Sequence, residues 1–250
     1  MKRITAGLFI CAGLAAAAGC NGTPTTPGPS GGATSVTLVF SGSFTPGESP
    51  SNNFSLPGGA PLYITLGSLT NTAGVPLGSA VTLKFGISPA AGGCDALSKV
   101  GATASLKAQI NILASAGNYC VGLEDTTGVP VGANYSIRVV YGTPSGDAAP
   151  GTIVYANTVL PGGYTTRSFH ATTDGVVTIG MDAVGPVSTI GFGLGFLRND
   201  GIGCELTTSI MASAGSQVAV PVDAGEYCIK VFDPGTLAVP AIFTARIIHP

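Results

Sequence analysis

Few side chains in this sequence could do chemistry. Six cysteines and two histidines, His170 and His249, stand among 250 residues. A serine hydrolase needs a serine and a carboxylate around a histidine, and Asp174, four residues from His170, is equally explained by a strand followed by a turn. Neither a G-x-S-x-G nor an H-E-x-x-H motif occurs. The sequence therefore predicts no catalytic residues and a protein that is not an enzyme.

The 12 acidic residues are scattered, and only Glu124 and Asp125 are adjacent. Calcium needs several oxygen ligands from one compact loop, such as D-x-D-x-D, and the sequence has none. We expect Asp125 and Asp233 to begin turns instead. The glycine-rich run at 191–195 lacks the strand–helix context of a nucleotide loop and fits a buried strand. No metal site and no cofactor are predicted.

An internal repeat is the most informative pattern. Residues 116–125 (AGNYCVGLED) match 224–233 (AGEYCIKVFD) at an offset of 108 residues, and the same offset pairs YSIR at 135–138 with FTAR at 243–246. Phe54 matches Phe169 at an offset of 115, so insertions fall in loops. A turn-rich segment at 142–150 separates the copies. Two copies of one unit are the simplest explanation.

The cysteines follow this repeat. Cys94 and Cys120 in the first copy match Cys204 and Cys228 in the second. A redox or metal site would need C-x-x-C spacing or companion histidines, and neither is present. We expect the disulfides Cys94–Cys120 and Cys204–Cys228, each stabilising its domain by about 3.5 kcal/mol under the chain-entropy model. Pairing across the copies is the alternative.

The pattern within each copy is that of short strands. The chain has 38 Gly and 18 Pro, with 45% hydrophobic and 9% charged residues, a balance that opposes disorder. Apolar residues alternate over short runs bounded by turn residues, and no helical period is sustained. We predict an all-β protein of two tandem antiparallel β-sandwich (jelly-roll-like) domains at 34–145 and 150–250. The strands predicted are 61–66, 81–85, 119–123, 135–141, 176–181, 190–197, 218–222, 227–232 and 242–248.

The N-terminus has the layout of a secretory signal peptide. Lys2 and Arg3 precede an apolar run over 4–18, too short for a comfortable membrane span. The residues before Cys20 (LAAAAGC) resemble the lipobox of bacterial lipoproteins, although Ala17 stands where that family usually has Leu. The resemblance implies a signal peptide at 1–19 and a lipid on Cys20. Ordinary cleavage after an alanine is the alternative.

Residues 20–33 are rich in Pro, Gly and Thr and predict a flexible tether. Two or three acyl chains on Cys20 would hold the protein at a membrane. The expected location is the bacterial cell envelope, with the outer membrane or cell surface favoured over the inner membrane. Without Lys2 and Arg3 the chain keeps 8 basic and 12 acidic residues, so no nucleic-acid partner is expected.

Each copy resembles the bacterial pre-peptidase C-terminal domain. The resemblance rests on an aromatic-led strand, a glycine turn and an alternating strand at 54–66 and 169–181, and on Gly-x-Tyr at 117–119 and 225–227 followed by an acid. It implies an eight- or nine-stranded sandwich that accompanies secreted proteins. The family's Asp-rich strand start is replaced by SAV at 79–81 and STI at 188–190, which removes the basis for a calcium site.

Tyr119 and Tyr227 stand beside the cysteines at strand starts. Each could stack on a ligand, but we favour packing at a sheet corner with the hydroxyl on a backbone group. The function predicted is a non-catalytic binding or structural role at the envelope. The alternatives are a surface module that binds a glycan or an envelope protein, and an atypical secreted hydrolase, which would need a pocket gathering His170 with a serine and an acid.

Overall fold

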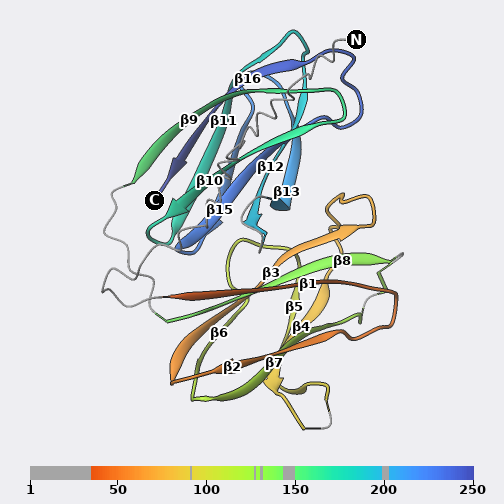
Figure 1. The fold of residues 1–250 in the computed structure, drawn as a ribbon, viewed down its shortest axis with the longest axis vertical. Coiled ribbons are helices and arrows are strands. Elements are labelled where there is room, and N and C mark those ends of the chain that lie inside the picture. The colour runs from red at the N-terminus through yellow and green to blue at the C-terminus, as the bar shows by residue number, and fades with distance from the viewer. Residues whose placement is uncertain (1–34, 91, 127, 130–131, 143–149, 199–202) are drawn as a thin grey trace, which may run out of the picture. The chain divides into compact units, whose positions relative to one another are not determined.

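The computed structural model describes residues 35–250 except 91, 127, 130–131, 143–149 and 199–202. The predicted signal peptide at 1–19, Cys20 and the tether up to residue 33 lie outside the described residues. Within the described residues the protein is all-β, with sixteen strands and no helix. The strands form four antiparallel four-stranded sheets, which pair into two β-sandwiches (Figure 1), as predicted.

Eight strands build each sandwich. Those of the first are β1 (Val36–Phe44), β2 (Ser51–Leu56), β3 (Ala60–Asn71), β4 (Val81–Ile87), β5 (Asp95–Ala102), β6 (Ile110–Ala114), β7 (Gly117–Glu124) and β8 (Ala133–Tyr141). Those of the second are β9 (Gly151–Val159), β10 (Tyr164–Ala171), β11 (Gly175–Gly185), β12 (Ile190–Leu197), β13 (Cys204–Ala212), β14 (Gln217–Val222), β15 (Gly225–Phe232) and β16 (Ala241–His249).

The two sandwiches have the same topology. In the first, the sheets run β1-β8-β3-β6 and β2-β7-β4-β5, and in the second β9-β16-β11-β14 and β10-β15-β12-β13. This is the strand order of an eight-stranded jelly roll. Even the bulges coincide, since β3 shifts register between Leu66 and Ser68 where β11 shifts between Met181 and Ala183. The repeat in the sequence is thus a repeat of the fold.

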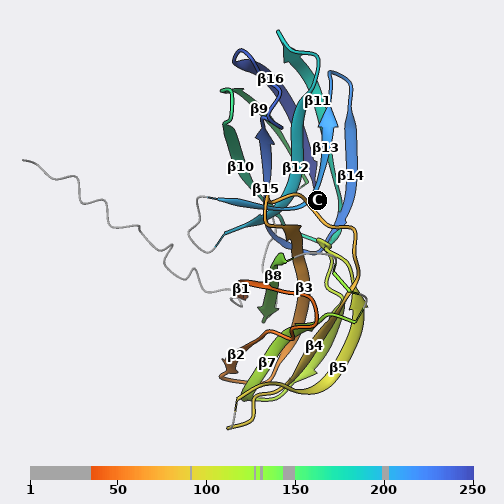
Figure 2. The ribbon, with the colours of Figure 1, turned by 90° about the vertical axis from the view of Figure 1, so that its right-hand side faces the viewer.

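The two sheets of each sandwich face each other (Figure 2). Each sandwich has its own apolar core. Alternation explains which residues enter it, because successive side chains of a strand point to opposite faces. Along β16, for example, Phe243, Ala245 and Ile247 are buried while Ile242 and Ile248 are exposed. All nine strands predicted from alternation are present.

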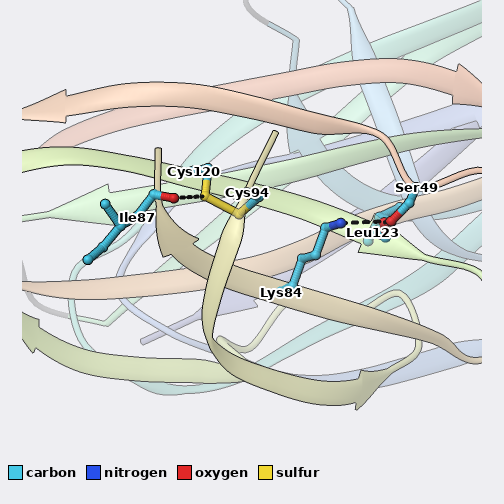
Figure 3. Close-up of a disulfide and its surroundings, with 6 residues drawn as sticks. All are labelled: Ser49, Lys84, Ile87, Cys94, Cys120 and Leu123. Atoms are coloured by element: carbon cyan, nitrogen blue, oxygen red, sulfur yellow. Dashed lines mark hydrogen bonds between the residues drawn. A yellow bond between two sulfur atoms is a disulfide. The ribbon is translucent and has the colours of Figure 1, made fainter. Parts of the chain in front are cut away.

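One disulfide crosses a strand in each sandwich. Cys94 joins Cys120 (Figure 3) and Cys204 joins Cys228, with Cα atoms 5.5 and 5.7 Å apart. In the sheet, β4 lies between β7, which carries Cys120, and β5, which follows Cys94. The strand β12 lies in the same way between β15 and β13. Each bond therefore ties together two strands that are not neighbours.

A glycine at the crossing point makes this possible. Gly86 of β4 pairs with Cys120, and Gly195 of β12 pairs with Cys228. Both glycines stand at a bulge, and a Cβ on either would overlap a carbonyl oxygen, that of Asp95 or that of Glu205. The missing side chain lets the backbone next to the first cysteine pass close over the middle strand.

We predict that Gly195→Ala lowers the free energy of unfolding by about 1–3 kcal/mol, because the new methyl group overlaps the Glu205 carbonyl. Gly101→Ala is the matched control: it also lies in a strand, and a Cβ there would meet nothing within 4 Å. Denaturant unfolding of both oxidised variants measures the difference. Equal stabilities would show that the close approach is not required.

Candidate functional site

One outer sheet face of the first sandwich is polar and yet buried. Thr65 and Ser68 of β3 and Ser136 and Arg138 of β8 are at most 5% exposed. An outer face of an antiparallel sandwich is ordinarily solvated. Here the second sandwich covers it, with β3 in contact with β12 and β13. Residues 32–250 accordingly form one compact unit. We call this contact the junction.

Hydrogen bonds satisfy the polar groups of the junction. The Ser68 hydroxyl donates to Glu205 Oε1 at 2.8 Å and lies 3.0 Å from the Ser136 hydroxyl. The Thr207 hydroxyl donates to the Gly67 carbonyl oxygen. Buried polar groups without such partners would cost free energy, so these pairs fix which surfaces meet.

Arg138 is the largest polar side chain at the junction. Its guanidinium carbon lies 4.9 Å from the ring centroid of Phe196 and 5.7 Å from that of Tyr227, within the range of cation–π attraction. Burial lowers the pKa of Arg138, while Tyr227 and the acids Asp223 and Glu226 partly offset that effect. Burial also raises the pKa of the Tyr227 hydroxyl to about 12. A charged arginine thus faces a neutral tyrosine.

An apolar side chain enters from the segment between β5 and β6. Leu106 of the first sandwich is buried within the core of the second. The Tyr227 hydroxyl lies 3.3 Å from the Leu106 carbonyl oxygen, and Asp223 accepts a hydrogen bond from the Ala108 amide at 2.7 Å. The junction therefore combines the apolar packing of Leu106 with the cation–π contacts of Arg138.

The structure packs both tyrosines singled out in the sequence. The Tyr119 hydroxyl donates to the Ser115 carbonyl, and the Tyr227 hydroxyl donates to the Asp223 carbonyl, each four residues earlier in the chain. Tyr119 stacks on Phe85 with ring centroids 5.2 Å apart. The two residues differ in one respect, since Tyr227 is fully buried by the junction and Tyr119 is half-buried.

A cavity of about 500 Å³ opens at the junction. Its charged lining consists of Arg198, Glu205 and Lys230, two cations and one carboxylate. The carboxylate already accepts a hydrogen bond from Ser68. The remaining lining comprises Ser41, Gly42, Thr70, Gly74, Asn134, Tyr135, Cys204 and Leu206. Positive charge and neutral hydrogen-bonding groups therefore meet in one concave site.

Lys230 is held in the cavity by aromatic rings. Its ammonium lies 4.4 Å from the ring centroid of Tyr164 and 5.9 Å from that of Phe232. Among the residues that the structure describes, it donates no hydrogen bond. Burial lowers its pKa, and the charge of Arg198 lowers it further. An anion in the cavity would relieve this repulsion.

The first sandwich has a lysine in the same cross-strand pair but on the other strand, and its charge is satisfied internally. Lys84 of β4 stands opposite Gly122 of β7, whereas Lys230 of β15 stands opposite Gly193 of β12. The Lys84 ammonium donates to the Ser49 hydroxyl at 2.7 Å, and that hydroxyl donates to the Leu123 carbonyl (Figure 3). Burial lowers the pKa of Lys84 too. Only the second copy presents its lysine to a cavity.

A second cavity, of about 280 Å³, brings together Ser35, His170 and Glu226. His170 Nδ1 lies 2.8 Å from Glu226 Oε1, and their side chains are 44% and 57% exposed. The described residues show no hydrogen bond between Ser35 and His170. Asp174, the acid near His170 in sequence, instead accepts a hydrogen bond from the Ala224 amide. A histidine, an acid and a serine do share this pocket.

The remaining candidates have structural surroundings. Asp125 and Asp233 each accept backbone hydrogen bonds within a turn, from Gly128 and Gly235 respectively. Among the described residues, no group of three or more His, Cys, Asp or Glu side chains could hold a metal ion. The same part of the chain contains no helix with the length and apolar character needed to cross a membrane.

Sequence reasoning singled out Tyr227 and Cys204 but not the charged residues of the junction and its cavity. Arg138, Arg198, Glu205 and Lys230 carry no motif of a binding site. One signal was present, because the repeat aligns Arg138 with Arg246. It could not show that one arginine is buried and the other exposed.

No protein family model and no curated protein matches the chain. Solved structures do match, and two of them illustrate how distant the similarity is. One, from Sulfolobus turreted icosahedral virus, has 12% identity and a TM-score of 0.27 over 87% of this chain and 93% of that chain. The other, PNGase F, a glycosylasparaginase from Flavobacterium meningosepticum, has 8% identity and a TM-score of 0.29 over 86% of this chain and 96% of that chain. At such TM-scores neither similarity bears on the function of this chain.

We predict that Arg138→Ala lowers the free energy of unfolding by about 2–4 kcal/mol, because it removes a buried side chain and its contacts with two rings. The repeat supplies a matched control, Arg246→Ala, which removes an exposed arginine paired with Asp182. That change should cost about 0.5 kcal/mol or less. Denaturant unfolding of the two variants measures the difference. Equal losses of unfolding free energy would contradict the role given to Arg138.

Proposed function

We propose that this chain is a lipid-anchored protein of the bacterial envelope that binds a ligand, without catalysis, in the cavity at its junction. The observation that carries the proposal is the meeting of Arg198 and Lys230 in a concave site of about 500 Å³. Ligand sites are typically concave and hold a few convergent polar groups. The protein as a whole has a net charge of −2, so a cavity with two cations and one carboxylate departs from its surroundings.

The chemistry of the lining favours an acidic saccharide. A carboxylate on a sugar would meet the guanidinium of Arg198 and the ammonium of Lys230 through charge-assisted hydrogen bonds. Sugar hydroxyl groups would find Ser41, Thr70 and Asn134, which the first sandwich contributes to the lining. A glycan is also the kind of partner expected for a surface module of the envelope.

Calorimetric titration tests this role. The oxidised chain from Asn21 onward, which retains the compact unit of residues 32–250, is titrated with trigalacturonate, with the neutral trisaccharide maltotriose and with inorganic phosphate. We expect trigalacturonate to bind and maltotriose to bind at least about tenfold more weakly, because it lacks the carboxylates. Lys230→Gln should weaken trigalacturonate binding by a similar factor.

Lys99→Gln is the matched control, since it removes the same charge from an exposed lysine of the first sandwich that pairs with Glu124. It should leave binding unchanged. Failure of the wild-type chain to bind either saccharide would overturn the proposal. Phosphate binding as tight as that of trigalacturonate would show that the cavity selects small anions and not saccharides.

A hydrolase is the second candidate, favoured by the cavity that holds Ser35, His170 and Glu226. The exposure of the His170–Glu226 pair argues against it, because the acid–base pair of a triad is ordinarily held in a buried, oriented position. Cleavage of trigalacturonate during the titration, lost in Glu226→Gln, would replace the binding role with this one.

The anchor is a separate part of the proposal and rests on the lipobox at Cys20. Two or three acyl chains should carry the wild-type protein into the detergent phase of a two-phase extraction. We predict that Cys20→Ala moves the exported chain to the aqueous phase. Cys11→Ala, which changes a cysteine inside the predicted signal peptide, is the control and should partition like the wild type. A Cys20→Ala chain that stays with the detergent would refute lipidation.

A further inference from the structure

The outer face of the sheet β9-β16-β11-β14 corresponds to the buried face of the first sandwich. Arg246 of β16 pairs with Val154 of β9, as Arg138 of β8 pairs with Val39 of β1. Two residues after each arginine stand Ile248 and Val140. Val140 is 6% exposed beneath the second sandwich, whereas Ile248 is 45% exposed. The second copy thus leaves the corresponding face uncovered, with Asp182 in the bulge where the first copy has Gly67.

That uncovered face is unusually apolar for solvent contact. Besides Ile248, the side chains of Val154, Val176 and Ile242 are exposed on strands of this one sheet. The same sheet carries the ion pair between Arg246 and Asp182, whose nitrogen–oxygen distance is 2.9 Å. Several exposed apolar side chains on one sheet are typical of an interaction site.

The second sandwich contributes one of its ends to the junction, and the corresponding end of the first sandwich is uncovered. In the second sandwich the docking end is formed by Phe196 of β12, Glu205 and Thr207 of β13, and Tyr227 of β15. The pairing registers place Ile87, Asp95 and Leu97 where Phe196, Glu205 and Thr207 stand.

The side chains at this end of the first sandwich are more exposed than their counterparts in the second. Phe196 is 3% exposed and its counterpart Ile87 is 49% exposed, while Leu97 is 60% exposed. Tyr119 is half-buried where Tyr227 is fully buried. The first sandwich therefore presents an open end of the kind that Arg138 and Leu106 close in the second.

We propose that these two surfaces bind each other between chains. The end surface of one copy (Ile87, Asp95 and Leu97) docks on the outer face of a second copy (Val154, Arg246 and Ile248), repeating the junction that already exists within each chain. Apolar side chains on both surfaces supply the area removed from water.

Because the two surfaces differ, the contact is head-to-tail. Such a heterologous contact generates rings or open filaments and not a closed two-fold dimer. The contact between chains is smaller than the junction, since the turn at 213–216 offers Ala214 where the first copy inserts Leu106. Association should therefore be weaker than the docking within a chain.

Light scattering of the oxidised chain from Asn21 onward tests this assembly. We expect the mass to rise with concentration past that of a dimer. Leu97→Ser should weaken association at least about tenfold, because it removes a buried leucine from the contact. Leu113→Ser is the matched control: Leu113 is 79% exposed on β6, outside both surfaces, and the change should have no effect. A wild-type chain that stays monomeric at its highest soluble concentration would overturn the proposal.

A mixture of two variants distinguishes head-to-tail contact from any other. Leu97→Asp places a carboxylate in the end surface and Ile248→Asp places one in the outer face, so each variant alone should be monomeric. In an equal mixture the intact end surface of Ile248→Asp can dock on the intact outer face of Leu97→Asp, and a dimer should form. Absence of assembly in the mixture, with both variants folded by their thermal transitions, would exclude the proposed contact.

Discussion

The arrangement of the described chain depends on how one polar sheet face is buried. The face that carries Ser68, Ser136 and Arg138 would be solvated in an isolated sandwich. Because a buried polar group without a partner costs free energy, burying this face requires a partner for each polar group. Glu205 and the rings of Phe196 and Tyr227 meet that requirement from the second sandwich. The partners are specific in position, so the junction allows one register of one copy on the other.

The same constraint creates the cavity. The polar contacts hold the two sandwiches together along β3 and β8, and the space beside them is left to Arg198, Glu205 and Lys230. The repeat shows that this is a property of the second copy and not of the fold, because the first copy has Gly122 where Lys230 stands. Lys84, on the strand opposite Gly122, finds Ser49 inside its own sandwich. Lys230 finds aromatic rings, which attract its charge without providing an acceptor.

The strands could be predicted from local alternation, and the cysteine pairs from the repeat. Alternation predicted every central strand and one edge strand, β14. It did not predict the other edge strands, because an edge strand buries fewer side chains and its pattern is weak; these are β1, β2, β5, β6, β9, β10 and β13. The cysteine pairs followed from their matching positions. The junction could not follow from the sequence, since Arg138 and Arg246 stand in equivalent local patterns. Only the docking of one sandwich on the other separates their environments.

Duplication of a module that docks on itself leaves an unmatched surface at each end of the pair. A single chain satisfies one docking face and one docking end, and the counterparts, Arg246 with Ile248 and Ile87 with Leu97, remain outside the junction. The side chains of these surfaces are not those that line the cavity, so assembly and ligand binding need not compete. An assembly would repeat the cavity along its length, and a polymeric glycan that met several cavities at once would bind more tightly than one site allows. Confinement to a membrane by the predicted lipid would raise the local concentration of chains and favour the same outcome.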